Sequence, residues 1–223
     1  MTNCVLVVAA HTDDEALGCG GTIARHVAEG DVVYAVFMAG GVTSREGVVQ
    51  EDLIGRHAAA ENARTILGIK ENIYLGLPDN RMDSIPLIDV VQKLEPIIDK
   101  LQPNIVYTHH HGDLNVDHRI THQAVMTACR PQPGSSVRAI YAFEVMSSTE
   151  WATPAAEPFL PNYFVDISKH LRKKNDVLNA YHMEMRKVPH SRSAEHLTTL
   201  ASHRGQSVGL LAAEAFISIR VLI

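Results

Sequence analysis

The stretch Cys4-Val-Leu-Val-Val-Ala-Ala-His-Thr-Asp-Asp-Glu15 decides the fold. It begins with an unbroken apolar run up to Ala10, which is typical of a strand buried on both faces of a parallel sheet. The run ends abruptly in side chains that can bind a cation, namely His11, Asp13, Asp14 and Glu15. Functional groups of open α/β sheets gather at the carboxyl ends of such strands. Three acids beside a histidine at this place therefore favour a bound cation.

Two other interpretations of this stretch compete with a cation site. In the first, Asp13 or Asp14 only caps the helix that follows, because a negative charge is favourable near the positive end of the helix dipole. A cap needs one acid, so this interpretation leaves the other polar groups unexplained.

In the second interpretation, the segment Leu17-Gly-Cys-Gly-Gly-Thr-Ile-Ala24 resembles a dinucleotide-binding fingerprint. The glycines of that fingerprint directly follow the strand and let a pyrophosphate approach the helix N-terminus. Here Gly18 comes eight positions after Ala10, and the acidic cluster would occupy the place of the anion. We therefore reject a nucleotide at this turn, and the glycines indicate close packing of the helix on the sheet.

The composition is that of an ordinary globular protein, with 46% hydrophobic and 20% charged residues. A length of 223 residues predicts a single domain spanning 1–223. The net charge of −5 gives no support for a nucleic-acid or anionic-membrane partner. The cysteines at 4, 19 and 129 have no short-spaced pair, which favours a reducing compartment. The first residues do not have the pattern of a basic leader, and no apolar run reaches membrane-spanning length, so we expect neither a leader nor a membrane span. We therefore expect a cytoplasmic protein.

Strands alternate with helices along the chain. We expect strands at 4–10, 31–39, 72–75, 105–108, 139–145 and 163–167. We expect helices at 17–28, 51–67, 87–101 and 117–129, then one that Ser168 caps and that carries Leu171 to Met185, and a last helix that ends near Gly205. This alternation predicts parallel βαβ units and a Rossmann-like three-layer α/β/α sandwich with a mostly parallel sheet.

A second polar cluster, His109 to His118, follows the fourth expected strand. Because the carboxyl ends of parallel strands lie along one edge of a sheet, this cluster can meet the first one. His11, Asp14 and His118 would then form a set of two histidines and one carboxylate. Three protein ligands with open positions describe a catalytic zinc site, although the same set also suits ferrous iron. Asp13 would face a metal-bound water as its general base.

Other pairings of the histidines stay open. His118 and His122 lie four residues apart on one helix, a spacing that can bind zinc, but the glutamate that metalloproteases use is missing. We expect His122 to be packed or to support a ligand. At least one of His109, His110 and His111 should be exposed. The sequence has no Gly-x-Ser-x-Gly elbow, which removes the commonest serine-hydrolase signature for an α/β protein.

The motifs Ala10-His-Thr-Asp-Asp-Glu15 and Asp117-His-Arg119 together resemble those of the LmbE/PIG-L family of zinc-dependent de-N-acetylases. Segments 41–45, 77–81 and 189–193 also look like those of bacterial members, so the resemblance covers nearly the whole chain. The resemblance implies that Asp13 is the general base and that the metal ligands are His11, Asp14 and His118. It further implies a substrate pocket lined by Arg45, Arg56 and Asp79.

Two residues depart from the family pattern. Thr12 stands where the family usually has proline, which should alter the rigidity of the turn more than its chemistry. Asn115 stands three residues before the last ligand, where several members have a histidine that helps to stabilise the tetrahedral oxyanion. Asn115 can donate a hydrogen bond there but supplies no positive charge, so either the metal does more or a nearby histidine substitutes.

The resemblance implies hydrolysis of the N-acetyl group of an N-acetylglucosamine-type amino sugar or its conjugate, with release of acetate. Zn²⁺ is the expected cofactor, one per chain, with Fe²⁺ as the alternative. Two other functions stay open: a non-catalytic sugar- or nucleotide-binding α/β module with a structural metal, and a metal amidase acting on a non-sugar amide. Because relatives often self-associate, analogy also allows a homo-oligomer in which the His190/Arg192 turn faces a neighbour's site.

Overall fold

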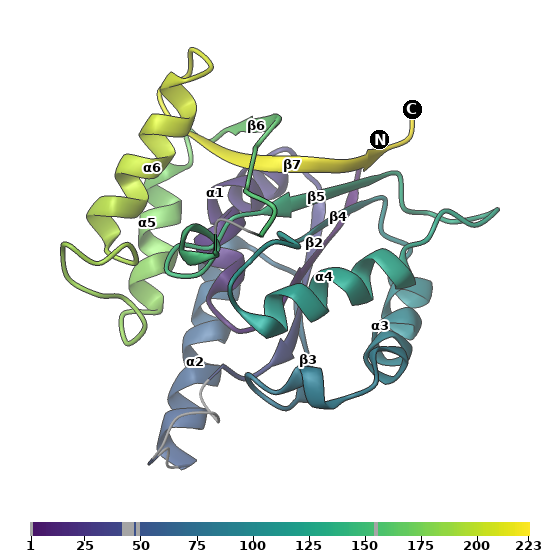
Figure 1. The fold of residues 1–223 in the computed structure, drawn as a ribbon. Coiled ribbons are helices and arrows are strands. Elements are labelled where there is room, and N and C mark those ends of the chain that lie inside the picture. The colour runs from purple at the N-terminus through teal and green to yellow at the C-terminus, as the bar shows by residue number, and fades with distance from the viewer. Residues whose placement is uncertain (1, 42–46, 48–49, 154–155) are drawn as a thin grey trace.

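The computed structural model describes residues 2–41, 47, 50–153 and 156–223. In these ranges the chain forms a seven-stranded sheet in the order β3-β2-β1-β4-β5-β7-β6 (Figure 1). β1 to β5 run parallel, whereas β7 runs antiparallel to both β5 and β6. The strands are β1 (Cys4–Ala9), β2 (Val32–Ala39), β3 (Glu71–Leu77), β4 (Ile105–His109), β5 (Ala139–Phe143), β6 (Tyr163–Asp166) and β7 (Ala213–Val221).

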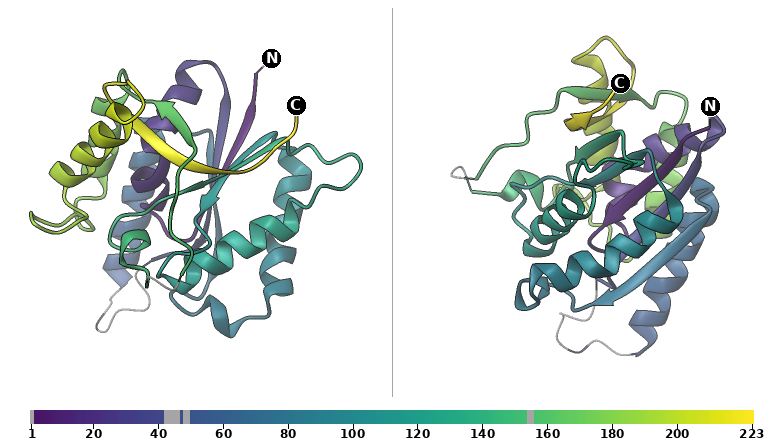
Figure 2. Two further views of the ribbon diagram at one scale, coloured as in Figure 1. Left: turned by 45° about the horizontal axis from the view of Figure 1, so that its top comes forward. Right: turned by 90° about the vertical axis from the view of Figure 1, so that its right-hand side faces the viewer.

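Helices cover both faces of the sheet and so make three layers (Figure 2). One face packs against α1, α2, α5 and α6, and the other face packs against α3 and α4. The α-helices are α1 (Asp14–Ala28), α2 (Gln50–Leu67), α3 (Leu87–Leu101), α4 (Val116–Ala128), α5 (Leu171–Ala180) and α6 (Ala194–Gln206). Two short 3-10 helices are η1 (Met82–Ser84) and η2 (Thr149–Trp151). The predicted α/β/α sandwich with a mostly parallel sheet is therefore confirmed.

β1 is buried on both faces, as its unbroken apolar run predicts. One core takes the side chains of Val5, Val7 and Ala9. The core on the other face takes Leu6, Val8 and Ala10, and all six residues are fully buried. Burial of each valine or leucine side chain stabilises the fold by about 1.5–3 kcal/mol. The strand is thus firmly held, and so is the start of the turn that follows it.

The two polar clusters meet where the strand order changes direction. β1 pairs with β2 on one side and with β4 on the other, and the chain visits β2 and β3 before it crosses to β4. Ligands of open α/β sheets bind in the crevice outside the carboxyl ends of the strands at such a switch point. The turn after β1 and the loop after β4 lie together at this crevice.

An ion pair buried between α5 and β7 also holds α1 in place. Lys174 of α5 lies against the carboxylate of Glu214 on β7 and donates to the carbonyl oxygen of Leu17 at 3.0 Å. The same carboxylate accepts from the backbone N–H groups of Gly21 (2.9 Å) and Thr22 (2.7 Å) in α1. Both charges are therefore paired and hydrogen-bonded, the condition under which burial of charge is tolerated.

The second half of the chain differs from the sequence analysis in one unassigned strand and in two wrong expectations about α5. β7 is a strand that the sequence analysis leaves unassigned, because its position depends on pairing with β5 far earlier in the chain. Ser168 does not cap α5: its hydroxyl donates to Asp166 Oδ1 at 2.5 Å, and α5 has no side-chain cap. α5 also ends at Ala180 rather than near Met185.

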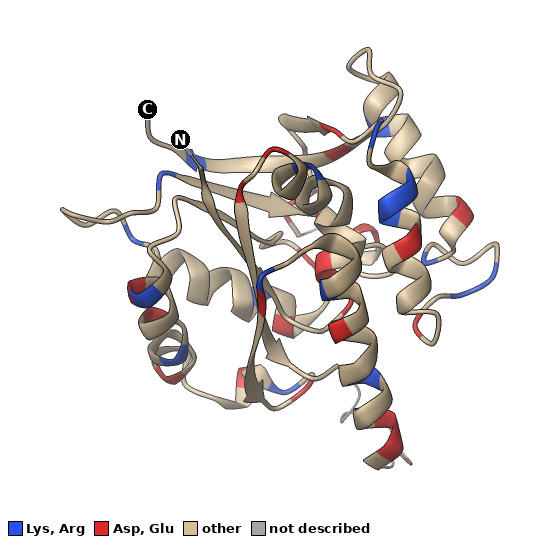
Figure 3. Cartoon of the chain, turned by 180° about the vertical axis from the view of Figure 1, so that it is seen from behind, with Lys and Arg blue, Asp and Glu red and all other residues tan. Residues whose placement is uncertain are grey.

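Charged residues of both signs are interspersed over the helices (Figure 3). This mixture differs from the one-sided basic face of nucleic-acid-binding proteins. Among the helices in the described ranges, none has the length and apolarity needed to span a bilayer.

Candidate metal centre and active site

The turn between β1 and α1 presents Asp13 to the site. Asp13 has a left-handed backbone conformation, with φ 109° and ψ −28°, and its side chain makes no cap hydrogen bond. Its neighbours serve the turn instead: Asp14 Oδ2 accepts from His11 N at 2.9 Å, and Glu15 Oε2 accepts from Asp13 N at 3.0 Å. The interpretation of Asp13 as a simple helix cap is therefore wrong. Its backbone conformation costs about 1–3 kcal/mol and leaves its carboxylate to other partners.

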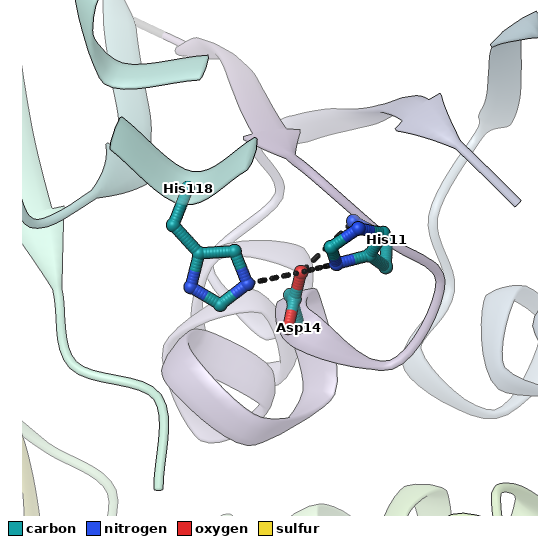
Figure 4. A group of neighbouring side chains, drawn as sticks. All are labelled: His11, Asp14 and His118. Carbon is teal, nitrogen blue, oxygen red and sulfur yellow. Dashed lines mark hydrogen bonds and ion pairs between the residues drawn. The ribbon is translucent and has the colours of Figure 1, made fainter. Parts of the chain in front are cut away.

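Three buried side chains bring metal-binding atoms together between β1 and α4 (Figure 4). Asp14 Oδ2 lies 3.4 Å from His11 Nδ1 and 3.4 Å from His118 Nε2. The ligand atoms of the three residues all lie within 4.8 Å of one another, and each residue is at most 7% exposed. The structure thus brings together the three residues that the sequence predicts as ligands, a donor set that suits a divalent metal.

The outer nitrogen of His11 is held by two acids. His11 Nε2 donates to Asp117 Oδ2 at 3.0 Å and lies 3.2 Å from Asp79 Oδ1. Asp117 is fixed in turn by the backbone N–H groups of Asn80 (2.6 Å) and Met82 (3.0 Å). Outer hydrogen bonds of this kind orient metal-bound histidines and fix their tautomer. His11, Asp79 and Asp117 themselves form a compact donor group, but it uses the nitrogen opposite Nδ1, so we interpret it as support for the ring.

His118 has the same arrangement on its far side. His118 Nδ1 lies 3.1 Å from Asp113 Oδ1. The hydroxyls of Ser148 and Thr149 donate to the Asp113 carboxylate, the second at 2.6 Å. Burial alone would raise the pKa of Asp113, but His118 and these hydrogen bonds lower it to about 2. Asp113 therefore stays ionised and holds the ring of His118 with Nε2 toward Asp14.

The charge balance of the site fits a bound cation. Four buried carboxylates surround the rings of His11 and His118, namely those of Asp14, Asp79, Asp113 and Asp117. Burial lowers the pKa of His118, but Asp14 and Asp113 outweigh that effect and raise it to about 9. Buried negative charge needs a positive partner. A divalent cation on these donors supplies that charge when the histidines bind as neutral ligands.

Two guanidinium groups flank Asp13. Arg56 Nη2 lies 3.1 Å from Asp13 Oδ1, and Arg192 Nη1 donates to Asp13 Oδ2 at 3.2 Å. Burial raises the pKa of Asp13, and the two arginines counteract that rise. Arg192 belongs to the turn that, by analogy with relatives, could face the site of a neighbouring copy in a homo-oligomer. In the structure this turn reaches the site of its own chain.

Arg56 is anchored by partners on two other elements. It is 6% exposed, and its Nη1 lies 2.8 Å from Glu184 Oε1. Its Nε donates to Thr12 Oγ1 at 2.6 Å, and its Nη2 donates to the carbonyl oxygen of Thr12. A proline at position 12 would lack the hydroxyl, so this departure from the family pattern adds a hydrogen bond. Glu184 is a site residue that the sequence analysis misses, because no local pattern marks a loop glutamate as the partner of a distant arginine.

A cavity of about 170 Å³ adjoins the metal-binding atoms and Asp13. Of the residues predicted to bind substrate, Arg56 and Asp79 line the cavity, whereas Arg45 falls outside the described residues. Asn115 lines it as well. Its Oδ1 caps α4 by accepting from Asp117 N at 2.8 Å, and its Nδ2 donates to Asn80 Oδ1 at 3.1 Å. The wall also includes Gly41, Ser147, Ser148, Glu184 and Arg192.

Neighbouring histidines support this centre. His109 Nε2 accepts from Ala10 N at 2.8 Å, and its ring stacks on that of His118 with 3.9 Å between centroids. His122 Nδ1 donates to the carbonyl oxygen of His109 at 2.8 Å. His122 is thus packed against the loop, and within the described residues it does not join His118 in a metal-binding group.

Comparison with known proteins shows which proteins this chain resembles. A model of the PIG-L family, described as GlcNAc-PI de-N-acetylase, matches residues 6–129. The chain is 37% identical over 134 residues to the uncharacterized deacetylase YaiS of Escherichia coli K12. The aligned region covers 58% of this chain and 69% of that protein. It is 29% identical over 174 residues to a probable N-acetyl-α-D-glucosaminyl L-malate deacetylase 2 of Bacillus cereus, covering 74% and 78% of the two chains.

A solved structure shares the fold. The N,N'-diacetylchitobiose deacetylase of Pyrococcus horikoshii matches with a TM-score of 0.79 at 22% sequence identity, over 98% of this chain and 84% of that one. The fold, the donor set and the relatives together define an enzyme of the deacetylase class, a hydrolase of amide bonds. The chain belongs to the PIG-L family.

Proposed function

We propose that this enzyme removes the N-acetyl group from an N-acetylglucosamine-type amino sugar or its conjugate and releases acetate. The observation that carries the proposal is the placement of Asp13, a buried carboxylate that caps no helix and shares a cavity with His11, Asp14 and His118. The description of the family as a GlcNAc-PI de-N-acetylase and the similarity to a glucosaminyl-malate deacetylase support an acetamido sugar as substrate.

We take Zn²⁺ as the cofactor, because two imidazoles and one carboxylate with open positions make a catalytic zinc set, with Fe²⁺ as the alternative. His11, Asp14 and His118 would hold it, oriented by the acids behind the two rings. When bound, the metal polarises the acetamide carbonyl and lowers the pKa of water.

Asp13 moves the proton. Its carboxylate accepts a proton from water as the water oxygen attacks the acetamide carbon, and it returns the proton to the nitrogen as the C–N bond breaks. The products are acetate and the free amine. Arg56 and Arg192 lie 3.1 and 3.2 Å from its two oxygens, so they fix the carboxylate and favour its ionised form.

Asn115 is the donor that this chain offers to the developing negative charge on the carbonyl oxygen. An amide nitrogen carries two hydrogens, and one of those on Asn115 bonds to Asn80. The second is left for the oxyanion, in the role of the histidine found in several family members. Asp79 on the cavity wall, together with Arg56 and Arg45, binds the sugar.

The test measures acetate release from N-acetylglucosamine and its conjugates, with metal content determined on the same samples. Asp13→Asn keeps the shape of the side chain and removes the base. We expect turnover to fall about 10²–10⁴-fold while metal content and sugar binding persist. Sugar binding without acetate release by the wild type would indicate the binding module. Release confined to N-acetyl amino acids would indicate an amidase for non-sugar amides.

A further inference from the structure

The single tryptophan of the chain, Trp151, belongs to the same loop as two residues of the cavity wall. It ends η2, and the two serines that precede this helix, Ser147 and Ser148, are part of the cavity wall. Trp151 is 51% exposed. Trp151 is thus an exposed apolar side chain on a loop that also forms part of a strongly polar pocket. The deacetylation chemistry itself does not use this side chain.

The loop that carries Trp151 is held rigidly by its own hydrogen bonds. The Glu150 carboxylate accepts from the backbone N–H groups of Ser147 (2.7 Å) and Ser148 (3.2 Å). Thr149 Oγ1 accepts from Val145 N at 2.8 Å and donates to Asp113 at 2.6 Å. The indole is therefore preorganised relative to the metal site, which reduces the entropy lost when a ligand binds.

A second loop contacts the indole. The ring of His190 meets Trp151 edge to face, with 5.5 Å between centroids and 71° between planes. His190 Nδ1 accepts from Arg192 N at 3.0 Å, and Arg192 contacts Asp13. The contact between Trp151 and His190 thus joins the loop after β5 to the loop that delivers Arg192 to Asp13.

The size of the cavity limits how much of a substrate the cavity can enclose. A volume of about 170 Å³ is below the range of about 300–1,000 Å³ typical of pockets that enclose drug-sized ligands. A cavity of this size suits one acetamido sugar, so a group linked to that sugar would extend beyond the lining residues.

We propose that Trp151, supported by His190, forms a subsite that stacks against a second sugar ring linked to the acetamido sugar; this inference rests on the proposed function. A pyranose ring has an apolar C–H face and hydroxyl groups around its edge. The indole offers an apolar face, and Glu150, His190 and Ser147 provide polar groups around it. This combination suits a saccharide ring, whose apolar face can stack on the indole and whose hydroxyl groups can add hydrogen bonds to these polar groups.

The first test uses tryptophan fluorescence, excited selectively over the tyrosines, because all tryptophan emission from this protein comes from one indole. The inactive Asp13→Asn variant is titrated with N,N'-diacetylchitobiose, which has two linked sugar rings, and with N-acetylglucosamine, which has one. We expect the disaccharide to shift or quench the emission with saturation and the monosaccharide to leave it nearly unchanged. Equal responses to the two sugars, or no response to the disaccharide, would overturn the subsite.

The second test compares turnover of the two sugars by the wild type and Trp151→Ala. We expect Trp151→Ala to raise KM for the disaccharide about tenfold, with kcat and the monosaccharide constants unchanged, as for loss of one ring contact. Trp151→Phe should keep most of the preference for the disaccharide. Leu211→Ala, which alters another exposed side chain (81%), is the matched control. Equal effects of Trp151→Ala on both sugars would contradict the proposal.

The two proposals can fail separately. If the wild type releases no acetate from either sugar, the proposed function fails, while the fluorescence titration still decides whether Trp151 contacts a disaccharide. If acetate is released from both sugars with the same kcat/KM, the function stands and the subsite is refuted.

Discussion

Asp113 Oδ1 lies 3.1 Å from Nδ1 of His118, and the hydroxyls of two residues on the loop after β5, Ser148 and Thr149, hold the Asp113 carboxylate. The contact ties this loop to His118 on α4. The orientation of the His118 ring is therefore set by protein groups, independently of a cation.

Asp113→Asn tests that contact. The amide cannot serve as a charged acceptor for His118 Nδ1–H, so the ring loses both orientation and basicity. We expect metal affinity to fall about 10–100-fold, the usual effect of removing such a partner, as measured by competition with a chelator. Asp99→Asn, at an exposed position of α3, is the matched control. An unchanged affinity in Asp113→Asn would show that Asp113 does not support a metal ligand.

Asp14→Ala tests the metal centre itself. We expect about one zinc per chain in the wild type by elemental analysis and none in the variant, since the variant loses the only carboxylate of the donor set. Because a ligand that binds only the folded state stabilises it, a chelator should lower Tm of the wild type and leave Tm of Asp14→Ala unchanged. Stoichiometric metal in the variant would refute the three-residue donor set.

Comparing Asp13→Gly with Asp13→Ala tests the left-handed backbone at φ 109°. Both variants lose the carboxylate and its ion pairs equally, so the difference between them isolates the conformation. Glycine adopts positive φ without a Cβ penalty, and we expect Asp13→Gly to exceed Asp13→Ala in free energy of unfolding by about 1–2 kcal/mol.

The control for this pair is Lys93, an exposed residue within α3. There Lys93→Gly should be less stable than Lys93→Ala by about 1 kcal/mol, the ordinary cost of glycine in a helix. Urea denaturation of all four variants measures both differences. The same sign at the two positions would contradict a strained Asp13.

Lys174→Met tests the buried ion pair. The substitution leaves Glu214 buried without a cation, which should lower the free energy of unfolding by about 3–5 kcal/mol in urea denaturation. Adding Glu214→Gln to this variant should restore part of that loss. Arg130→Met, which breaks the exposed pair with Glu95, should cost no more than about 1 kcal/mol. A similar cost for both single variants would show that burial of the first pair has no energetic consequence.

The sequence predicts the parallel part of the sheet because strands buried on both faces leave a local signal, an apolar run. β7 lacks that signal. Ser218 and Arg220 interrupt its apolar residues, and its place between β5 and β6 is set by pairing across long stretches of chain. The alternation of polar residues with Ile217 and Ile219 is the pattern that would have indicated a half-buried strand.

The sequence also predicts that His11, Asp14 and His118 lie close together, because their positions follow from where two parallel strands end. The groups that hold them do not follow from local pattern. Asp113 supports His118 from the loop before α4, and Glu184 reaches Arg56 from the turn after α5. Partners of this kind depend on how elements pack, which hydrophobic periodicity does not specify.

The position of β7 has a consequence for biosynthesis. During synthesis β5 and β6 leave the ribosome before β7, yet in the described part of the chain β6 pairs with no strand except β7. Until residues 213–221 emerge, β5 presents an unpaired strand edge, and such edges are templates for pairing with other chains. Until then Lys174 also lacks its ion-pair partner Glu214, because Glu214 is a residue of β7. β7 thus leaves the ribosome after both of the strands that it pairs with, and its insertion joins β6 to the sheet and pairs the buried charges of Lys174 and Glu214.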